Sequence, residues 1–358
     1  MVRKYERGPI KNLLKSSTGF TAGLILGGLA LDQLQHFNPA VGAVGSFVRS
    51  GVVGAWTGVY DYTKNNWAGG DDEQTAYLLM VFGSNIMHFV TFWTQCLIHT
   101  VFDFWPTNPL WSWTQAWRIQ NPDEPTNRMK LFKTAMVCLF NQLCINFPLA
   151  YVGWKYTDVS SKMSTHPDDI PTFNAFLKMM AVIAIVEEIG FYYGHRLFHQ
   201  PFFYKRFHKM HHEWTASVSF VAIYADPLEH IVSNLGPVMM GPYICGAHGV
   251  VYWFWLWLAV AVTIQVHSGY HFPFLPSSEF HDFHHLKFNV NYGVLGFLDW
   301  FHCTDGMFYE DKYKHLGERD RVFFSLSSKS EMTKQLSVAK VGGAMKAPIA
   351  NKGSCKTM

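Results

Sequence analysis

Long apolar runs, separated by short polar segments, dominate the first three quarters of this chain. They cover residues 75–99, 131–154, 175–194, 231–248 and 249–266. Each is close to the length of about 20 residues that a helix needs to cross a bilayer. Glycines at 246 and 249 interrupt the last two runs, which predicts a transmembrane hairpin over 231–266. The pattern therefore predicts an all-α, polytopic integral membrane bundle.

The pattern divides the chain into four regions. Residues 1–70 begin with several basic residues and continue with short apolar stretches, so their topology stays open. Within them, 40–60 could be a further span or could lie against the membrane. Residues 71–174 hold two transmembrane helices and a connecting loop, and 175–310 hold the remaining apolar runs together with most histidines. Residues 311–358 form a polar tail, whose last part we expect to be disordered.

The composition agrees with a membrane protein. Charged residues make up only 15% of the chain and aromatic residues 16%, whereas soluble domains carry about 25% charged residues. The net charge of +3 is too small to indicate a nucleic-acid partner.

Histidine is concentrated in the third region. Twelve of the 18 histidines lie between His195 and His285, and ten of these form four clusters. The clusters comprise His195 and His199; His208, His211 and His212; His267 and His271; and His281, His284 and His285. Residues three or four apart share one face of a helix, and neutral imidazole is the commonest metal ligand. Ten imidazoles are too many for one ion, so the clusters predict two metals with about four or five ligands each.

The kind of metal follows from the donor set. A zincin would show His-Glu-x-x-His, and the segment from His212 to Ala216 lacks its final histidine. Structural zinc sites are usually closed by four ligands, often cysteines. A pair of all-histidine sites suits iron used in oxygen chemistry.

The chain resembles the fatty acid hydroxylase / sterol desaturase superfamily. The resemblance rests on residues 203–213 (FYKRFHKMHHE), the cluster at 195–199 before them and the cluster at 281–285 after them. Residues 213–216 and 224–230 are most similar to the C4-methylsterol oxidase-like branch. Asp226 and the segment 302–304 depart from that branch and leave the subclass open.

This resemblance implies a membrane-bound non-haem di-iron oxygenase that uses O2 to oxidise a C–H bond of a lipid. A sterol is the favoured substrate, and a fatty acyl or other lipid is the alternative. Residence in the endoplasmic reticulum membrane and electrons from an external donor, such as cytochrome b5 with its reductase, are also implied. Two other classes stay open: a histidine-rich membrane protein that transports or stores metal, and a scaffold that has lost its activity.

Several residues are predicted to support the ligands. Glu188, Tyr192, His195 and His199 step by four, three and four, so they share one face of a helix. A carboxylate in an apolar run usually has a functional role. We expect Glu188 to accept the second ring N–H of a ligand histidine, with a polar contact to a neighbouring helix as the alternative.

Three further residues are candidates for similar roles. Asp282 and Asp299 could support the last histidine cluster in the way expected of Glu188, and His230 is placed behind the ligands or in the substrate pocket. His248 and His302 are not expected among the ligands.

The basic residues near the clusters predict which side of the membrane the site faces. Lys205, Arg206 and Lys209 flank the first clusters, and further lysines follow the last. Positively charged loops stay in the cytoplasm, so we expect the site to face the cytosol. Three apolar runs precede His195; either a segment before residue 60 also crosses, or one run is re-entrant, or the chain starts outside.

Overall fold

A computed structural model describes residues 39–119, 126–272 and 275–308. The expectations for residues 1–38 and for the tail beyond residue 308 lie outside this range. Within it, every regular element is a helix, and the one β-type pairing is an isolated bridge between Arg118 and Tyr270. The prediction of an all-α membrane protein is confirmed.

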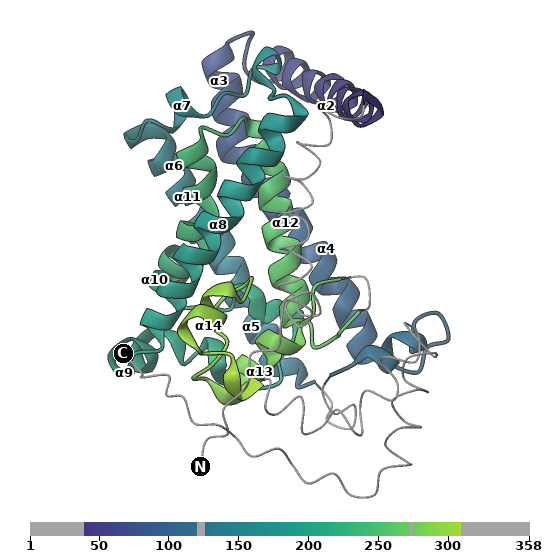
Figure 1. The fold of residues 1–358 in the computed structure, drawn as a ribbon, viewed down its shortest axis with the longest axis vertical. Coiled ribbons are helices and arrows are strands. Elements are labelled where there is room, and N and C mark those ends of the chain that lie inside the picture. Colours follow the sequence, from purple (N-terminus) through teal and green to yellow (C-terminus); the bar gives the residue numbers. More distant parts are fainter. Residues whose placement is uncertain (1–38, 120–125, 273–274, 309–358) are drawn as a thin grey trace, which may run out of the picture.

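Five helical rods run along the long axis of the described part of the molecule and form the bundle (Figure 1). The first is α3 (Asp72–Tyr77), η2 (Leu78–Gly83) and α4 (Ser84–Phe104), and the second is α5 (Arg128–Phe140), η4 (Asn141–Asn146) and α6 (Phe147–Tyr156). The third is α8 (Phe173–Phe198), the fourth is α10 (Pro227–Glu229), η9 (His230–Leu235) and α11 (Gly236–Cys245), and the fifth is α12 (Gly249–His267). Four of the five predicted runs lie entirely in these rods, and the run at 231–248 is helical as far as Cys245.

The rods differ in how clearly they qualify as membrane spans. Asp72–Phe104, Arg128–Tyr156 and Gly249–His267 are long and apolar enough to cross a membrane. Two further rods, α8 and α10–α11, pack closely against each other within the bundle. The first, second and fourth rods each contain a π-helical segment, η2, η4 and η9 respectively.

Glycine allows the tight turn of the predicted hairpin and a close approach between α11 and α8. Gly246 caps α11 with a φ of 55°, a conformation that L side chains rarely adopt. Between α11 and α8, a Cβ on Gly241 would lie 2.9 Å from the Cα of Ile183. The two backbones can pack at this separation only because position 241 has no side chain.

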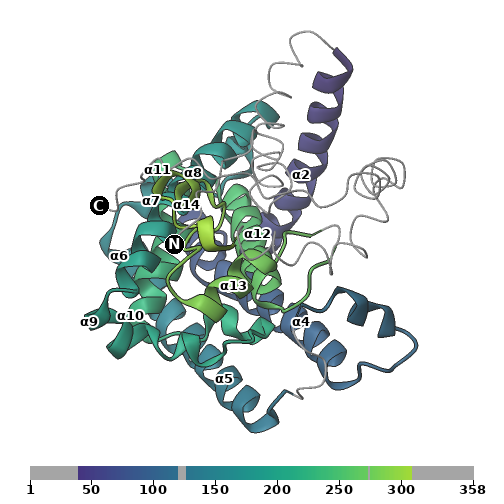
Figure 2. The same cartoon turned by 60° about the horizontal axis from the view of Figure 1, so that its bottom comes forward.

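Short elements collect at the two ends of the bundle (Figures 1 and 2). The lower end in Figure 1 carries η3 (Ser112–Trp117), α9 (Pro201–Phe203), η6 (Tyr204–His208), η7 (His211–Glu213), η8 (Ser219–Ile223), α13 (Glu279–Lys287) and α14 (Phe297–His302). The opposite end carries α2 (Pro39–Asn66), α7 (Val159–Lys162) and η5 (Pro167–Asp169). The chain runs along the bundle five times between residue 72 and the last histidine cluster. These two segments therefore lie at opposite ends of the bundle.

Helix α2 lies across the bundle end instead of along the bundle (Figure 1). Trp56 donates a hydrogen bond from Nε1 to the carbonyl of Thr165 (2.8 Å), and Arg49 donates to the carbonyl of Ile170 (2.8 Å). On its outer side Phe47 is 80% exposed. Helix α2 is not among the described helices that are long and apolar enough to cross a membrane.

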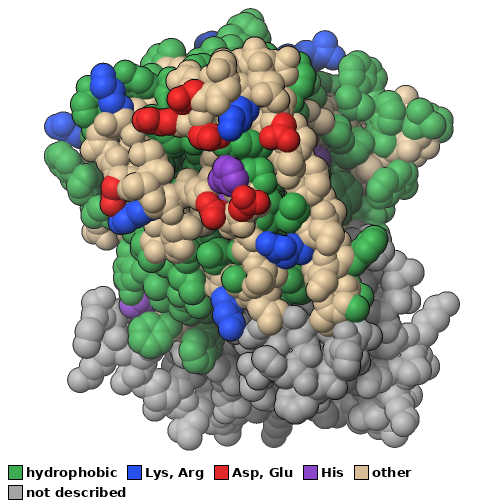
Figure 3. All heavy atoms as spheres, turned by 90° about the horizontal axis from the view of Figure 1, so that it is seen from above, with side chains coloured by type: hydrophobic (Ala, Val, Ile, Leu, Met, Phe, Trp, Pro, Cys, Tyr) green, Lys and Arg blue, Asp and Glu red, His purple; other side chains and the backbone are tan. Residues whose placement is uncertain are grey.

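The end that carries α2 is rich in charge. Viewed onto this end, charged side chains gather near the middle and hydrophobic side chains surround them (Figure 3). Exposed acidic residues of this end include Asp71, Asp72, Glu73 and Asp168. This end of the bundle therefore has a charged centre with apolar side chains around it.

Candidate metal centre

Nine buried or half-buried histidines meet at the lower end of the bundle in two groups. Those of the first group are His195, His199, His208, His212 and His284, and those of the second are His211, His267, His281 and His285. Within each group the candidate ligand atoms all lie within 4.8 Å of one another. The predicted division into two sites of four or five histidines matches this arrangement.

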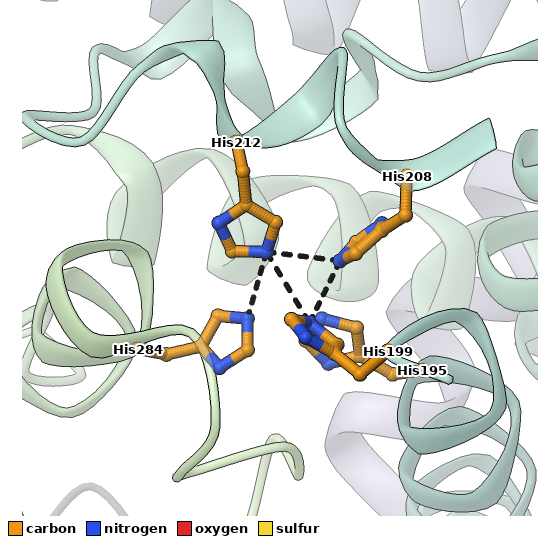
Figure 4. A group of neighbouring side chains, drawn as sticks. All are labelled: His195, His199, His208, His212 and His284. Carbon is orange, nitrogen blue, oxygen red and sulfur yellow. Dashed lines mark hydrogen bonds between the residues drawn. The ribbon is translucent and has the colours of Figure 1, made fainter. Parts of the chain in front are cut away.

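In the first group the rings point at a common centre (Figure 4). Nε2 of His208 lies 2.9 Å from Nε2 of His199 and 2.9 Å from Nε2 of His212. Nε2 of His284 lies 3.2 Å from that of His212. The end of α8, the turn at η6–η7 and helix α13 each contribute to this centre.

The second group converges in the same way. Nε2 of His281 lies 2.8 Å from Nε2 of His267 and 3.2 Å from Nε2 of His285. The ring of His211 is 4.7 Å from the ring of His285, measured between centroids. Its donors come from the end of α12, from η7 and from α13.

In most of these rings a backbone carbonyl determines which nitrogen carries the proton. Five rings donate from Nδ1 to a carbonyl: His195 to Tyr292 (2.8 Å), His211 to Tyr224 (3.2 Å), His267 to Thr263 (2.7 Å), His284 to Val290 (2.6 Å) and His285 to Trp214 (3.0 Å). A carbonyl only accepts, so in each ring the proton sits on Nδ1. The lone pair of Nε2 then faces the centre of the group, as a metal ligand requires.

Glu229 supports a sixth ring, and sequence reasoning missed it. Its Oε1 lies 2.7 Å from Nδ1 of His208, and both side chains are buried. A carboxylate that holds a ligand histidine in this way also raises its basicity. The sequence did carry a signal, because an acid directly precedes His230 in the otherwise apolar start of the fourth rod.

The donor set fits two metal ions. Facing lone pairs on neutral nitrogens 2.8–3.3 Å apart repel unless a cation lies between them. Burial, reinforced by neighbouring imidazoles, lowers the pKa of His208, His212 and His284 well below the usual value, so protons do not serve as that cation. A metal that binds imidazole nitrogen at about 2.1 Å holds adjacent donors about 3 Å apart. Both groups have this spacing.

The structure does not bring the tenth predicted ligand, His271, into either group. Helix α12 ends at His267, and Gly269 turns the chain with a φ of 75°. His271 therefore does not lie one helical turn beyond His267. Its Nδ1 instead lies 2.7 Å from the hydroxyl of Ser277.

Glu188 has a different role from the one predicted. Its Oε2 accepts the backbone N–H groups of Val294 (2.9 Å) and Leu295 (2.7 Å), and not a ring N–H. Asp299 accepts those of Tyr292 (2.8 Å) and Gly293 (2.7 Å). The two acids fix the loop whose carbonyl at Tyr292 holds His195, so they act on the ligands through the backbone.

The other predicted residues lie around the two groups. Tyr192 is buried, and its hydroxyl lies 3.2 Å from the hydroxyl of Thr304. Asp282 is half-buried on α13 beside His281. Neither His248, at the far start of α12, nor His302, stacked on Tyr192, belongs to a group.

An apolar cavity reaches the second group. His267 and His281 line one part of it, and Phe92, Leu256 and Val260 are among the apolar residues that line the rest. His230 also lines this cavity, which is one of the two places predicted for it.

Comparison with known proteins adds a family to this geometry. A model of the fatty acid hydroxylase family matches residues 180–304, the segment that contains all nine grouped histidines. Human fatty acid hydroxylase domain-containing protein 2 is 46% identical over 199 residues, which are 55% of this chain and 59% of that protein. The match thus spans less than two thirds of this relative.

Longer matches occur at lower identity. Methylsterol monooxygenase 1 of Danio rerio is 31% identical over 261 residues, covering 70% of this chain and 86% of that protein. A very-long-chain aldehyde decarbonylase of Oryza sativa subsp. indica is 31% identical over 192 residues, covering 50% of this chain and 70% of that protein. No solved structure matches.

Proposed function

Because this chain belongs to the fatty acid hydroxylase family, we propose that it is a membrane-bound di-iron oxygenase that oxidises a C–H bond of a lipid. The observation that carries the proposal is the pair of histidine groups at the end of an apolar bundle, one of them facing a cavity. A transporter would hold its ligands near the middle of the membrane. The location of the groups at one bundle end therefore favours an enzyme.

The chain's own residues would prepare the site. The nine grouped histidines would hold two iron ions, which when bound supply the dioxygen and electron chemistry that an unactivated C–H bond requires. The carbonyls and Glu229 keep the rings oriented before the metal arrives. The apolar walls of the cavity exclude water and hold the lipid beside His267 and His281.

A sterol is the substrate we favour. The support is the motif resemblance at residues 213–216 and 224–230 and the match to methylsterol monooxygenase 1 over 86% of that protein. The more identical relative carries a fatty acid hydroxylase name, so a fatty acyl lipid is the second candidate.

We also propose that the site faces the cytosol of an endoplasmic reticulum membrane. Exposed Lys205, Arg206, Lys209 and Lys287 surround the histidine end, whereas acidic residues are exposed at the other end. The positive-inside rule favours this orientation. The same cations could steer an acidic electron donor, for which we propose cytochrome b5 and its reductase.

The proposal is tested by metal content and lipid composition together. Protein purified in detergent should contain two iron ions per chain after anaerobic loading, and the triple variant His208→Ala, His212→Ala and His284→Ala should lose at least one. Cells that carry the triple variant should accumulate 4-methylsterols relative to wild type. Accumulation of acyl lipids instead would select the second candidate. Absence of bound metal in the wild type would refute the oxygenase.

A further inference from the structure

A second polar cluster lies inside the bundle, separate from the nine grouped histidines. Its side chains come from the first, second and fourth rods: His88 from α4, Gln142 and Asn146 from the π-helical η4, and His230 and Asn234 from the π-helical η9. All except Asn234 are buried. Polar groups within membrane helices are costly and mark function, and π-helical turns often occur at functional sites.

Hydrogen bonds in this cluster fix where the proton of His88 lies. Trp93 donates from Nε1 to Oε1 of Gln142 (2.8 Å), so the amide nitrogen of Gln142 faces Nδ1 of His88 (3.0 Å). Nδ1 of His88 must therefore accept, and the proton sits on Nε2. That N–H has no acceptor among the described residues, and His88 lines the cavity.

The cluster also offers acceptors to the cavity. Nδ1 of His230 lies 3.2 Å from the amide nitrogen of Asn234, and its Nε2 lies 2.9 Å from Oδ1 of Asn146. This pairing leaves Oδ1 of Asn234 as an acceptor. Glu187 also lines the cavity, is only 8% exposed, and makes no hydrogen bond with any described residue. Its neighbour Glu188 holds the loop at 293–295, so the two glutamates have separate roles.

Building on the function proposed above, we propose that His88, Glu187 and Asn234 bind the hydroxyl group of an uncharged lipid alcohol. A hydroxyl both donates and accepts, so it can pair with the N–H of His88 and with an acceptor on Glu187 or Asn234. An acidic headgroup would meet Glu187, and no lysine or arginine is among the described residues that line the cavity. A pure hydrocarbon would leave all three groups unpaired, which costs free energy.

The cavities extend to both sides of the cluster. One side reaches His267 and His281 of the second histidine group. On the other side a second cavity shares His88 with the first, and a third adjoins it at Tyr252. The anchored hydroxyl would thus determine which C–H bond lies beside the histidines.

The test measures binding to metal-free protein, so it does not depend on turnover. Detergent micelles would contain an equimolar pair, either cholesterol with 5α-cholestane or octadecan-1-ol with octadecane, and mass spectrometry would quantify the lipid that co-purifies. In at least one pair the wild type should enrich the alcohol over its hydrocarbon by roughly tenfold relative to the micelle, as two modest hydrogen bonds provide.

Substitutions then locate the selectivity. Glu187→Leu and His88→Phe should each reduce the enrichment several-fold, whereas Glu187→Gln, which keeps an acceptor, should retain most of it. Glu73→Leu, at an exposed position of α3, is the matched control. Equal retention of alcohol and hydrocarbon by the wild type, no retention of either, or enrichment that survives both substitutions would overturn the anchor.

The outcome separates the anchor from the oxygenase. A chain that selects alcohols but binds no iron would contradict only the proposed function. A chain that binds two irons and oxidises lipid, yet shows no preference for the alcohol, would contradict only the anchor. If a variant does not fold, the wild-type comparison still decides.

Discussion

Removal of the Glu229 carboxylate should weaken the five-histidine site and leave the four-histidine site intact. Glu229→Leu takes away the acceptor that lies 2.7 Å from Nδ1 of His208. His208 is only 1% exposed, so water does not replace the lost acceptor. A buried donor without a partner costs about 1–3 kcal/mol, and loss of a partner that orients a ligand typically lowers metal affinity by about 10- to 100-fold.

The assay is anaerobic titration of the apoprotein with ferrous iron against a chelator of known affinity, followed by measurement of iron per chain. At a chelator strength where wild type keeps two ions, Glu229→Leu should keep about one. Glu229→Gln retains an acceptor oxygen and should lose less. Glu213→Leu is the matched control, because Glu213 is exposed beside His212 and pairs with the hydroxyl of Tyr224 and not with a ring. Equal iron content in Glu229→Leu and Glu213→Leu would refute the reasoning.

Three further predictions concern the same centre. His212→Ala should lose metal and His271→Ala should not, because only His212 belongs to a group; equal loss by elemental analysis would contradict the grouping. Gly293→Ala should lower both thermal stability and iron content, because its Cβ would lie 2.6 Å from Oε1 of Glu188; an unchanged melting temperature would contradict the tight loop. Metal-free protein should lose stability as pH falls below about 6.5, because unfolded histidines then take up protons while burial holds the pKa of the folded ones low. The slope is at most about 1.4 kcal/mol per pH unit for each histidine, and a higher melting temperature at pH 5.5 than at pH 7.5 would contradict it.

The sequence predicted those features that depend on local pattern. Apolar length predicted all five rods, and the spacing of His208, His211 and His212 predicted members of the two histidine groups, because both patterns lie in consecutive residues. The same local reasoning failed at His271. The chain leaves its helix before this residue, and the four-residue spacing from His267 no longer brings the two rings together.

Other features depend on parts of the chain that are far apart. His211 and His212 are neighbours, yet one joins the second group and the other the first, and no spacing rule distinguishes them. Most acceptors behind the rings are backbone carbonyls, such as those of Tyr292 and Trp214. Any residue type supplies a carbonyl, so the identity of these positions carries no signal. Glu188 was predicted to hold a ligand histidine, but its partners at 294 and 295 are more than 100 residues away.

The shared segments of the two groups have a consequence for how the protein matures. Helix α13 gives His284 to one group and His281 and His285 to the other, and the turn at η7 is divided in the same way. The first ion to arrive therefore orders two segments that the second ion also needs, which makes the second binding step more favourable. We expect wild-type chains, in which both sites are intact, to be mostly empty or fully loaded when iron is scarce, whereas a variant with one damaged site can hold a single ion. The supply of iron would then determine how many molecules in a membrane are fully loaded, and not how active each loaded molecule is.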